Sequence, residues 1–202
     1  MNFATLSKRF AFLGLAVALL SLTGCKLPAP PPPDFPQISF KQFGPIKLAV
    51  GQVEVLQDYN PPMKYPNVEQ SFPVSPGLMA ERWAKDRLVA AGGAGVARFT
   101  VNRASVVTVE LPRDDSFKGK LTTQQTTRYD AVLEVTLEIR NDRGYRDAVV
   151  TARVDRSQTV AEDITEADRQ RVWFKMTQEM GDDLNAQMQK NVSDALTKYV
   201  MY

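Results

Sequence analysis

The alternation of apolar and polar residues is most regular in the second half of the chain. Between residues 129 and 139 every odd-numbered position is apolar, and most of the positions between them are charged or polar. This period of two predicts a strand with one face on a core and the other in water. Residues 148–155 alternate in the same way after a turn over residues 141–144, so the two segments predict a hairpin.

Two further strands are expected earlier in the chain. Residues 96–111 carry an apolar phase that shifts at Asn102 and Arg103, which predicts a bulge there. Residues 47–56 change phase at Gly51 and predict a first strand, also with a bulge. The polar residues 112–127 are expected at the tip of a long hairpin.

Two segments have the three- and four-residue spacing of helices. The first begins at residues 75–76, a serine N-cap followed by proline, and is expected to end at the glycines of residues 92–93. The second begins at Thr165, which has capping-box spacing with Asp168. Both segments therefore predict helices with defined starts.

The second helix carries an apolar stripe at every fourth residue. The stripe consists of Val172, Met176, Met180, Leu184, Met188, Val192, Leu196 and Val200. A strict four-residue spacing drifts by about 40° per step around a helix, so residues 181–183 are expected to kink or cap it. The stripe is interpreted as core packing, with an adaptable methionine-rich binding surface as the alternative.

Together these elements predict an α+β fold in the order β-α-β-β-β-α. The three consecutive later strands should be antiparallel, while the first strand, joined through a helix, should lie parallel to one of them. Single-striped helices and a polar outer sheet face predict a two-layer sandwich, with two helices on one face of a four-stranded mixed sheet. We expect this single domain to span residues 45–202.

The N-terminal residues 1–24 have the pattern of an export signal. Lys8 and Arg9 precede an uncharged apolar run that is too short to span a bilayer, which needs about 20 apolar residues. The run ends in Leu22-Thr23-Gly24-Cys25, which resembles the lipobox of bacterial lipoproteins. An ordinary export signal followed by an unmodified thiol is the alternative.

The lipobox resemblance implies a lipid anchor on Cys25. It implies cleavage between Gly24 and Cys25, a diacylglycerol on the thiol, and a further acyl chain such as palmitate on the freed amine. Lys26, which is not acidic, implies sorting to the outer membrane, with the domain on the periplasmic face. Stable attachment needs at least two hydrophobic signals, and such a cysteine would supply them.

Residues 25–44 are interpreted as a tether. Six prolines between residues 28 and 36 favour polyproline II, which makes a semi-rigid spacer. The alternative is a proline-rich ligand for a partner. Removing residues 1–24 takes two of 25 basic residues and none of 23 acidic ones, which leaves a mature chain that is neutral. A neutral chain argues against nucleic-acid binding.

The residue types limit the chemistry. The chain has no histidine and one cysteine, so histidine-based catalysis and the usual zinc sites are excluded. We therefore expect no enzymatic activity, no metal and no cofactor. A carboxylate hydrolase using Asp114 or Glu134 is the weakest alternative, because Asp114 and Asp115 are expected in a solvated turn and Glu134 on a solvent face.

Two places are candidates for binding. The proline-rich residues 59–74 contain Tyr59, Met63, Tyr65 and Phe72, which either pack onto the domain or form an apolar lip that contacts a partner. A carrier of an acyl chain would instead need a pocket of about 300 Å³ or more between helix and sheet. We expect such a pocket to be lined by Met176, Met180 and Phe99.

Residues 45–200 resemble a group of periplasmic lipoproteins. The resemblance rests on residues 78–83 (LMAERW) after a proline-rich loop, the long hairpins, and Asp168-Arg169 before the methionine-rich helix. It is to the auxiliary lipoproteins of envelope ABC-type lipid transport and, more distantly, to the lipopolysaccharide-assembly lipoprotein. It implies an accessory protein that binds an envelope protein complex or a lipid in envelope biogenesis or lipid transport.

Overall fold

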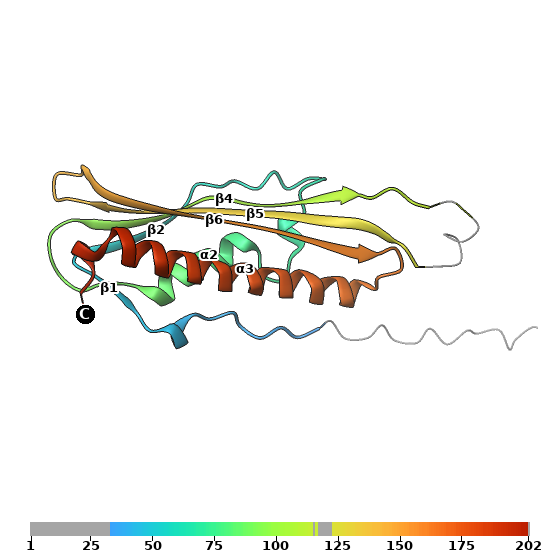
Figure 1. Cartoon of the computed structure of the whole chain (residues 1–202), viewed down its shortest axis with the longest axis horizontal. Coiled ribbons are helices and arrows are strands. Elements are labelled where there is room, and N and C mark those ends of the chain that lie inside the picture. The colour runs from blue at the N-terminus through green and yellow to red at the C-terminus, as the bar shows by residue number, and fades with distance from the viewer. Residues whose placement is uncertain (1–32, 115, 117–122, 202) are drawn as a thin grey trace, which may run out of the picture. The chain divides into compact units, whose positions relative to one another are not determined.

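The computed structural model describes residues 33–114, 116 and 123–201. The strands and helices, in chain order, are β1 (Ile46–Leu48), β2 (Gln52–Gln57), α2 (Pro76–Arg87), β3 (Leu88–Ala90), β4 (Val96–Glu110), β5 (Gln125–Arg140), β6 (Arg146–Ala161) and α3 (Glu166–Ala195) (Figure 1). Short 3₁₀ helices occur at Lys41–Phe43, Glu69–Ser71 and Thr197–Tyr199. None of the helices within these residues is long and apolar enough to cross a membrane.

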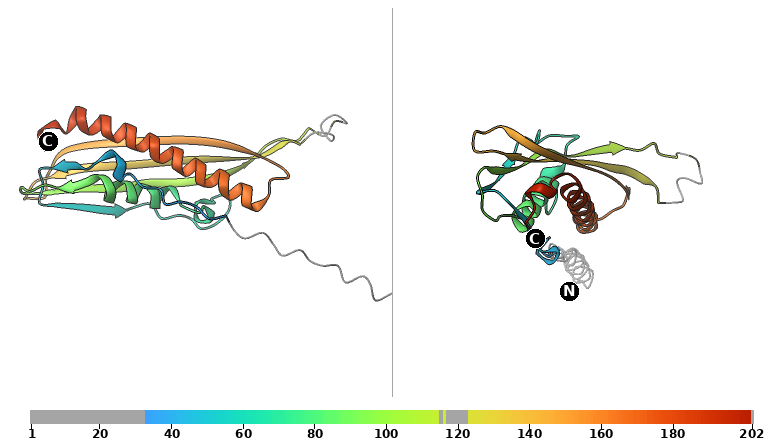
Figure 2. Two further views of the ribbon diagram at one scale, coloured as in Figure 1. Left: turned by 90° about the horizontal axis from the view of Figure 1, so that it is seen from below. Right: turned by 60° about the vertical axis from the view of Figure 1, so that its left-hand side comes forward.

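The main sheet has four strands in the order β2-β4-β5-β6. β2 runs parallel to β4, and β4, β5 and β6 form an antiparallel meander. Both helices lie on one face of this sheet, with α2 against β4 and α3 along β6 (Figure 2). The predicted α+β class, the four-stranded mixed sheet and the placement of the helices are confirmed.

The alternating pattern of β5 decides which face of the sheet is buried. The odd-numbered residues from Tyr129 to Ile139 are all less than 5% exposed, and they face the helices. The predicted bulge in β4 is also confirmed, because the pairing of β4 with β5 shifts between Val101 and Arg103. The shift keeps Phe99 before the bulge and Ala104 after it on the buried face.

The first predicted strand, residues 47–56, is wrong as a single element. The structure divides it into β1 and β2, which belong to different sheets, and β1 pairs in parallel with β3. The chain bends between them because the amide of Ala49 donates to the carbonyl of Tyr199 (2.8 Å) and that of Gly51 to Gly95 (3.0 Å). A bend held by two distant segments replaces the expected bulge.

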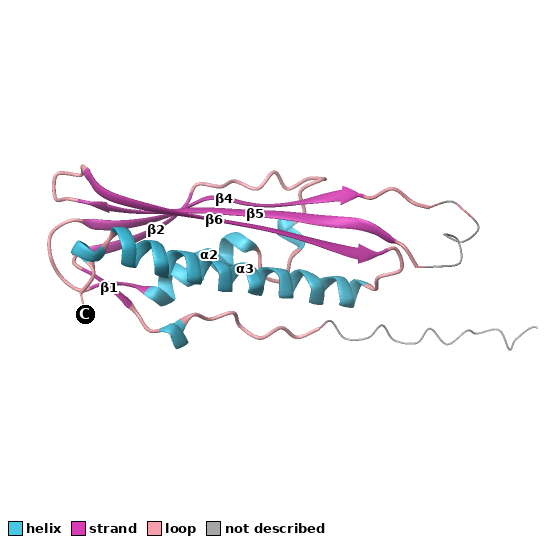
Figure 3. Cartoon of the chain, in the orientation of Figure 1, coloured by secondary structure: helices cyan, strands magenta, loops and turns pink. Residues whose placement is uncertain are grey.

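The end predicted for the first helix is also wrong. α2 ends at Arg87, and the next three residues form β3 instead of a last helical turn (Figure 3). Leu88 still donates its amide to the helical carbonyl of Ala84, but it lies opposite Ile46 of β1. Strand pairing with β1 therefore ends the helix before the glycines at 92–93.

The second helix, α3, starts where predicted and runs without interruption from Glu166 to Ala195. Thr165 is its N-cap and accepts a hydrogen bond from the amide of Asp168 (3.1 Å). The expected cap at residues 181–183 is wrong, because α3 continues through them to Ala195. Gly181 is buried, and a side chain there would meet Phe40 and Met79, so this glycine allows a close approach.

Residues 33–44 belong to the same compact unit as the rest of the described domain. Phe35 stacks on Phe174 of α3 with ring centroids 4.8 Å apart, and Phe40 is 1% exposed. The segment is also hydrogen-bonded to α2, because Asp86 accepts hydrogen bonds from the hydroxyl of Ser39 (3.0 Å) and the amide of Phe40 (2.9 Å). The chain thus enters the domain across both helices.

Candidate functional site

The loop between β2 and α2 separates the four candidate contact residues into two pairs. Phe72 is 6% exposed and stacks on Trp173 of α3, with ring centroids 4.9 Å apart. Tyr59 is partly buried against the core. Met63 and Tyr65 are 64% and 65% exposed. One pair therefore anchors the loop, and the other faces solvent.

A buried carboxylate holds this loop against the sheet. Glu69 is 3% exposed and accepts hydrogen bonds from the hydroxyl of Tyr59 (2.7 Å), the side-chain amide of Asn67 (3.3 Å) and the backbone amide of Val106 in β4 (3.0 Å). Burial and this bond to Glu69 raise the pKa of Tyr59 well above its usual value. Nothing in the local pattern of the sequence marks Glu69 as buried, so it was not among the predicted site residues.

The loop also continues the sheet at the edge of β4. β2 pairs only with the first part of β4, from Val96 to Val101. Beyond it, Val68 donates its amide to Val106 (2.9 Å) and Thr108 donates to the carbonyl of Pro66 (2.8 Å). The loop backbone thus occupies the edge that β2 leaves open, which fixes its position.

Met63 and Tyr65 project from this fixed backbone. Met63 has a positive φ of 57°, a conformation that costs energy for a residue with a side chain. The Tyr65 hydroxyl donates to Glu110 at the end of β4 (3.1 Å), which holds the exposed ring at the sheet edge. We call these two exposed side chains the loop knob.

The residues expected to line an acyl-chain pocket are packed instead. Met176, Met180 and Phe99 are 3%, 0% and 0% exposed, within one continuous apolar core. The cavities that the structure describes are lined by other residues. The methionine stripe of α3 is therefore part of the core along this stretch, as the first interpretation predicted.

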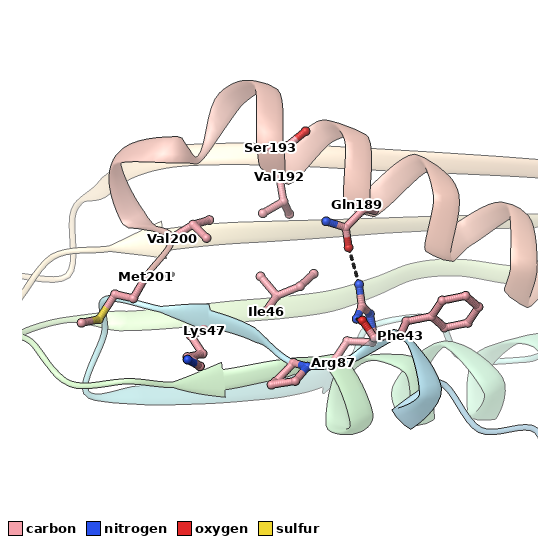
Figure 4. Close-up of a pocket in the computed structure, with 10 residues that line it drawn as sticks. Phe43, Ile46, Lys47, Arg87, Gln189, Val192, Ser193, Val200 and Met201 are labelled. Atoms are coloured by element: carbon pink, nitrogen blue, oxygen red, sulfur yellow. Dashed lines mark hydrogen bonds between the residues drawn. The ribbon is translucent and has the colours of Figure 1, made fainter.

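A cavity of about 420 Å³ lies at the C-terminal end of α3 (Figure 4). It opens between β1, the end of α2, and the last turns of α3 with the residues that follow. Ile46, Val192, Val200 and Met201 give it an apolar lining, and Arg87 borders it. This cavity was not predicted, because it depends on the small β1-β3 sheet, of which the sequence pattern gives no sign.

The two acidic residues considered for hydrolysis do not come together. Asp114 accepts a hydrogen bond from the amide of Ser116 (2.9 Å), which lowers the pKa of its carboxyl. Glu134 pairs with Arg153 on the outer face of the sheet. Along β4, Glu134 lies opposite Arg103, which places it roughly 20 Å or more from Asp114 at about 3.3 Å per residue.

The acid-rich outer face of the sheet is balanced by arginines. Arg98 pairs with Glu54 (2.9 Å), and Arg140 and Arg146 both pair with Glu138. No group of three or more residues of the metal-binding types gathers within the part of the chain that the structure describes. The predicted lipid site at Gly24 and Cys25 lies outside those residues.

Comparisons with known proteins give only loose similarities. No family model matches the chain, and no curated protein matches it. A minor lipoprotein from Acinetobacter baumannii is similar in structure, with a TM-score of 0.40, 13% identity, and coverage of 77% of this chain and 98% of the other. A DUF330 protein from Xanthomonas campestris is also similar in structure, with a TM-score of 0.33, 10% identity, and coverage of 81% of this chain and 98% of the other.

Proposed function

We propose that this protein is a lipid-anchored accessory protein of the bacterial envelope that works by contact with a protein partner. Cys25 would attach it to the periplasmic face of the outer membrane, and the proline-rich segment would set its reach. The loop knob would make the contact. In this proposal the protein holds a partner in envelope biogenesis or lipid transport and carries out no reaction itself.

The observation that supports this proposal is the combination of exposure and fixation in one loop. Met63 and Tyr65 expose apolar surface, while Glu69 and the backbone bonds to β4 hold the segment that carries them. A fixed apolar group loses little conformational freedom on binding, which favours affinity. Tyrosine is also among the residues enriched at protein interfaces.

Photo-crosslinking in cells tests this function. A photoreactive amino acid would replace Tyr65, and in a matched control it would replace Tyr145, which is 70% exposed in the β5–β6 turn. We expect the position 65 variant to capture a discrete envelope protein that the position 145 variant does not. Equal capture patterns from both positions would contradict the assignment of the contact.

The anchor is tested separately by Cys25→Ser. We expect the wild-type protein to fractionate with the outer membrane and to carry acyl chains by mass spectrometry, and the variant to lose both properties. A variant that still fractionates with the membrane would show that another part of the chain attaches it. The crosslinking result and the anchoring result can fail independently.

A further inference from the structure

One arginine is buried without a counter-ion among the residues that the structure describes. Arg87, the last residue of α2, is 2% exposed. Within the described residues no carboxylate forms an ion pair with it. The nearest acid in sequence, Asp86, is engaged by Ser39 and Phe40. A buried charge is costly unless it is paired, so this guanidinium calls for an explanation.

Neutral groups satisfy only part of the guanidinium. Its Nη1 donates to the backbone carbonyls of Phe43 and Gly44, and its Nη2 donates to Oε1 of Gln189 on α3. Nε has no partner among the described residues. The Phe43 ring lies 5.7 Å from the guanidinium carbon, and the C-terminal end of α2 favours a cation. None of these groups carries a negative charge.

The 420 Å³ cavity lies directly beside Arg87. Figure 4 shows the guanidinium bonded to Gln189 at one side of the cavity, with Val200 and Met201 at the other. Lys47, on β1, adds a second cation to the lining. The cavity therefore joins a positively charged end to an apolar wall, which is the arrangement that an anionic amphiphile requires.

We propose that this cavity binds a single-chain amphiphile with an anionic oxygen headgroup, a carboxylate or a phosphate, which pairs with Arg87. The hydrocarbon chain would lie along Ile46, Val192 and Met201. The volume falls in the lower part of the usual range for ligand pockets, about 300–1,000 Å³, which suits one chain better than two. This site is distinct from the loop knob and does not depend on the proposed partner contact.

The guanidinium can present a bidentate edge to such a headgroup. Nε, which is buried and has no partner among the described residues, and Nη2 form one of its forked edges. Gln189, which accepts the hydrogen bond from Nη2, is an exposed residue of α3. Exchange of this neutral amide for an anion would supply a counter-ion at Nη2.

Photoaffinity labelling tests the proposal. The probes are a photoreactive dodecanoate and a photoreactive dodecyl phosphate, which separate a carboxylate source from a phosphate source, with a neutral dodecanol analogue as control. The full-length protein, purified after processing in cells, is titrated with each probe. We expect at least one anionic probe to label residues near Val192 and Met201, and the neutral analogue to label them much more weakly.

Variants of the chain identify the group responsible. We expect Arg87→Met to raise the half-saturating concentration of the anionic probe by roughly 10- to 150-fold, the equivalent of a hydrogen-bonded charge. Lys85→Met, on the exposed face of the same helix, is the matched control and should leave it unchanged. Ser193→Trp, an exposed position on the cavity lining, should block labelling without removing a core side chain.

Defined outcomes would overturn the proposal. They are labelling that does not differ between the anionic and neutral probes, labelling that Ser193→Trp leaves unchanged, or absence of saturable labelling by either anionic probe. If Arg87→Met unfolds, the comparison of anionic and neutral probes on the wild-type chain and on Ser193→Trp still decides. Competition by acetate or inorganic phosphate that is as strong as competition by unlabelled dodecanoate or dodecyl phosphate at equal concentration would show a simple anion site and would also overturn it.

Discussion

The loop that carries the proposed contact depends on one carboxylate, so replacement of Glu69 by alanine should release it. The Val106 amide and the Tyr59 hydroxyl would both lose their acceptor. Each buried donor left unpaired costs about 1–3 kcal/mol, so the gross loss is about 2–6 kcal/mol. Removal of the carboxylate also removes the cost of desolvating it, which offsets part of this loss in free energy. We therefore expect a net loss of about 2–4 kcal/mol in the free energy of unfolding.

The matched control is another pair of the same residue types. Tyr65 donates to Glu110 at the surface (3.1 Å), and Glu110→Ala should change the free energy of unfolding by less than about 0.5 kcal/mol. Urea and thermal unfolding followed by circular dichroism measure both variants. For a domain of this size about 1 kcal/mol shifts Tm by roughly 2–4 °C, so Glu69→Ala should lower Tm by about 4–16 °C.

Amide exchange locates the effect within the domain. In Glu69→Ala the amides of Val106 and Thr108, which face the loop, should exchange faster relative to amides in the centre of β5. The reasoning is refuted if Glu69→Ala and Glu110→Ala destabilise the protein equally, or if exchange at Val106 is the same as in the wild-type chain.

Three further predictions follow from single residues. Burial raises the pKa of Tyr59 above its usual 10. Because the unfolded chain therefore ionises first, the stability that this tyrosine contributes is present below pH 10 and is lost as the pH rises above it. Tyr59→Phe should weaken the pH dependence of the urea midpoint in that alkaline range. Thr165→Ala removes the N-cap bond to Asp168 and should cost about 0.5–2 kcal/mol in urea unfolding. Gly95→Ala places a side chain against the Arg140 carbonyl at a φ of +95° and should cost at least about 1–3 kcal/mol in the same assay.

The elements that were predicted correctly depend on neighbours in sequence. The burial of alternate β5 residues, the Thr165 cap and the bulge before Ala104 each follow from a pattern within a few residues. Period, capping and phase shift are local properties, so the sequence expresses them directly. The order of elements then limited the topology to a few arrangements, and a mixed four-stranded sheet is among them.

The elements that were missed depend on distant partners. The bend that separates β1 from β2 exists because Ala49 bonds to Tyr199 and Gly51 bonds to Gly95. Residues 88–90 form β3 instead of continuing the helix because they pair with β1, where Ile46 lies opposite Leu88. Each of these contacts joins segments far apart along the chain, and no periodicity in residues 47–56 or 88–90 reports them.

The candidate sites show the same limit for charged residues. Residues 59–74 could be proposed as a contact loop from sequence, because aromatic residues among prolines rarely form a regular element, but the pattern did not separate the exposed Met63 and Tyr65 from the packed Phe72. Glu69 and Arg87 could not, because charged residues are usually exposed and their local pattern contains no sign of burial. Both are at most 3% exposed in the structure. Their roles appear only when their partners are known.

A comparison of these two buried charges explains why we assign them different roles. Both oxygens of Glu69 accept hydrogen bonds, and their donors come from the loop and from β4, so the carboxylate completes a structural connection. The two Nη atoms of Arg87 have carbonyl and amide acceptors, while its Nε has no partner within the part of the chain that the structure describes. Glu69 borders only a small cavity of about 70 Å³ and its oxygens are satisfied, whereas Arg87 borders a cavity of about 420 Å³. An unsatisfied donor on a buried charge calls for an explanation, and the proposed ligand offers one for Arg87, whereas the contacts of Glu69 within the fold account for its burial.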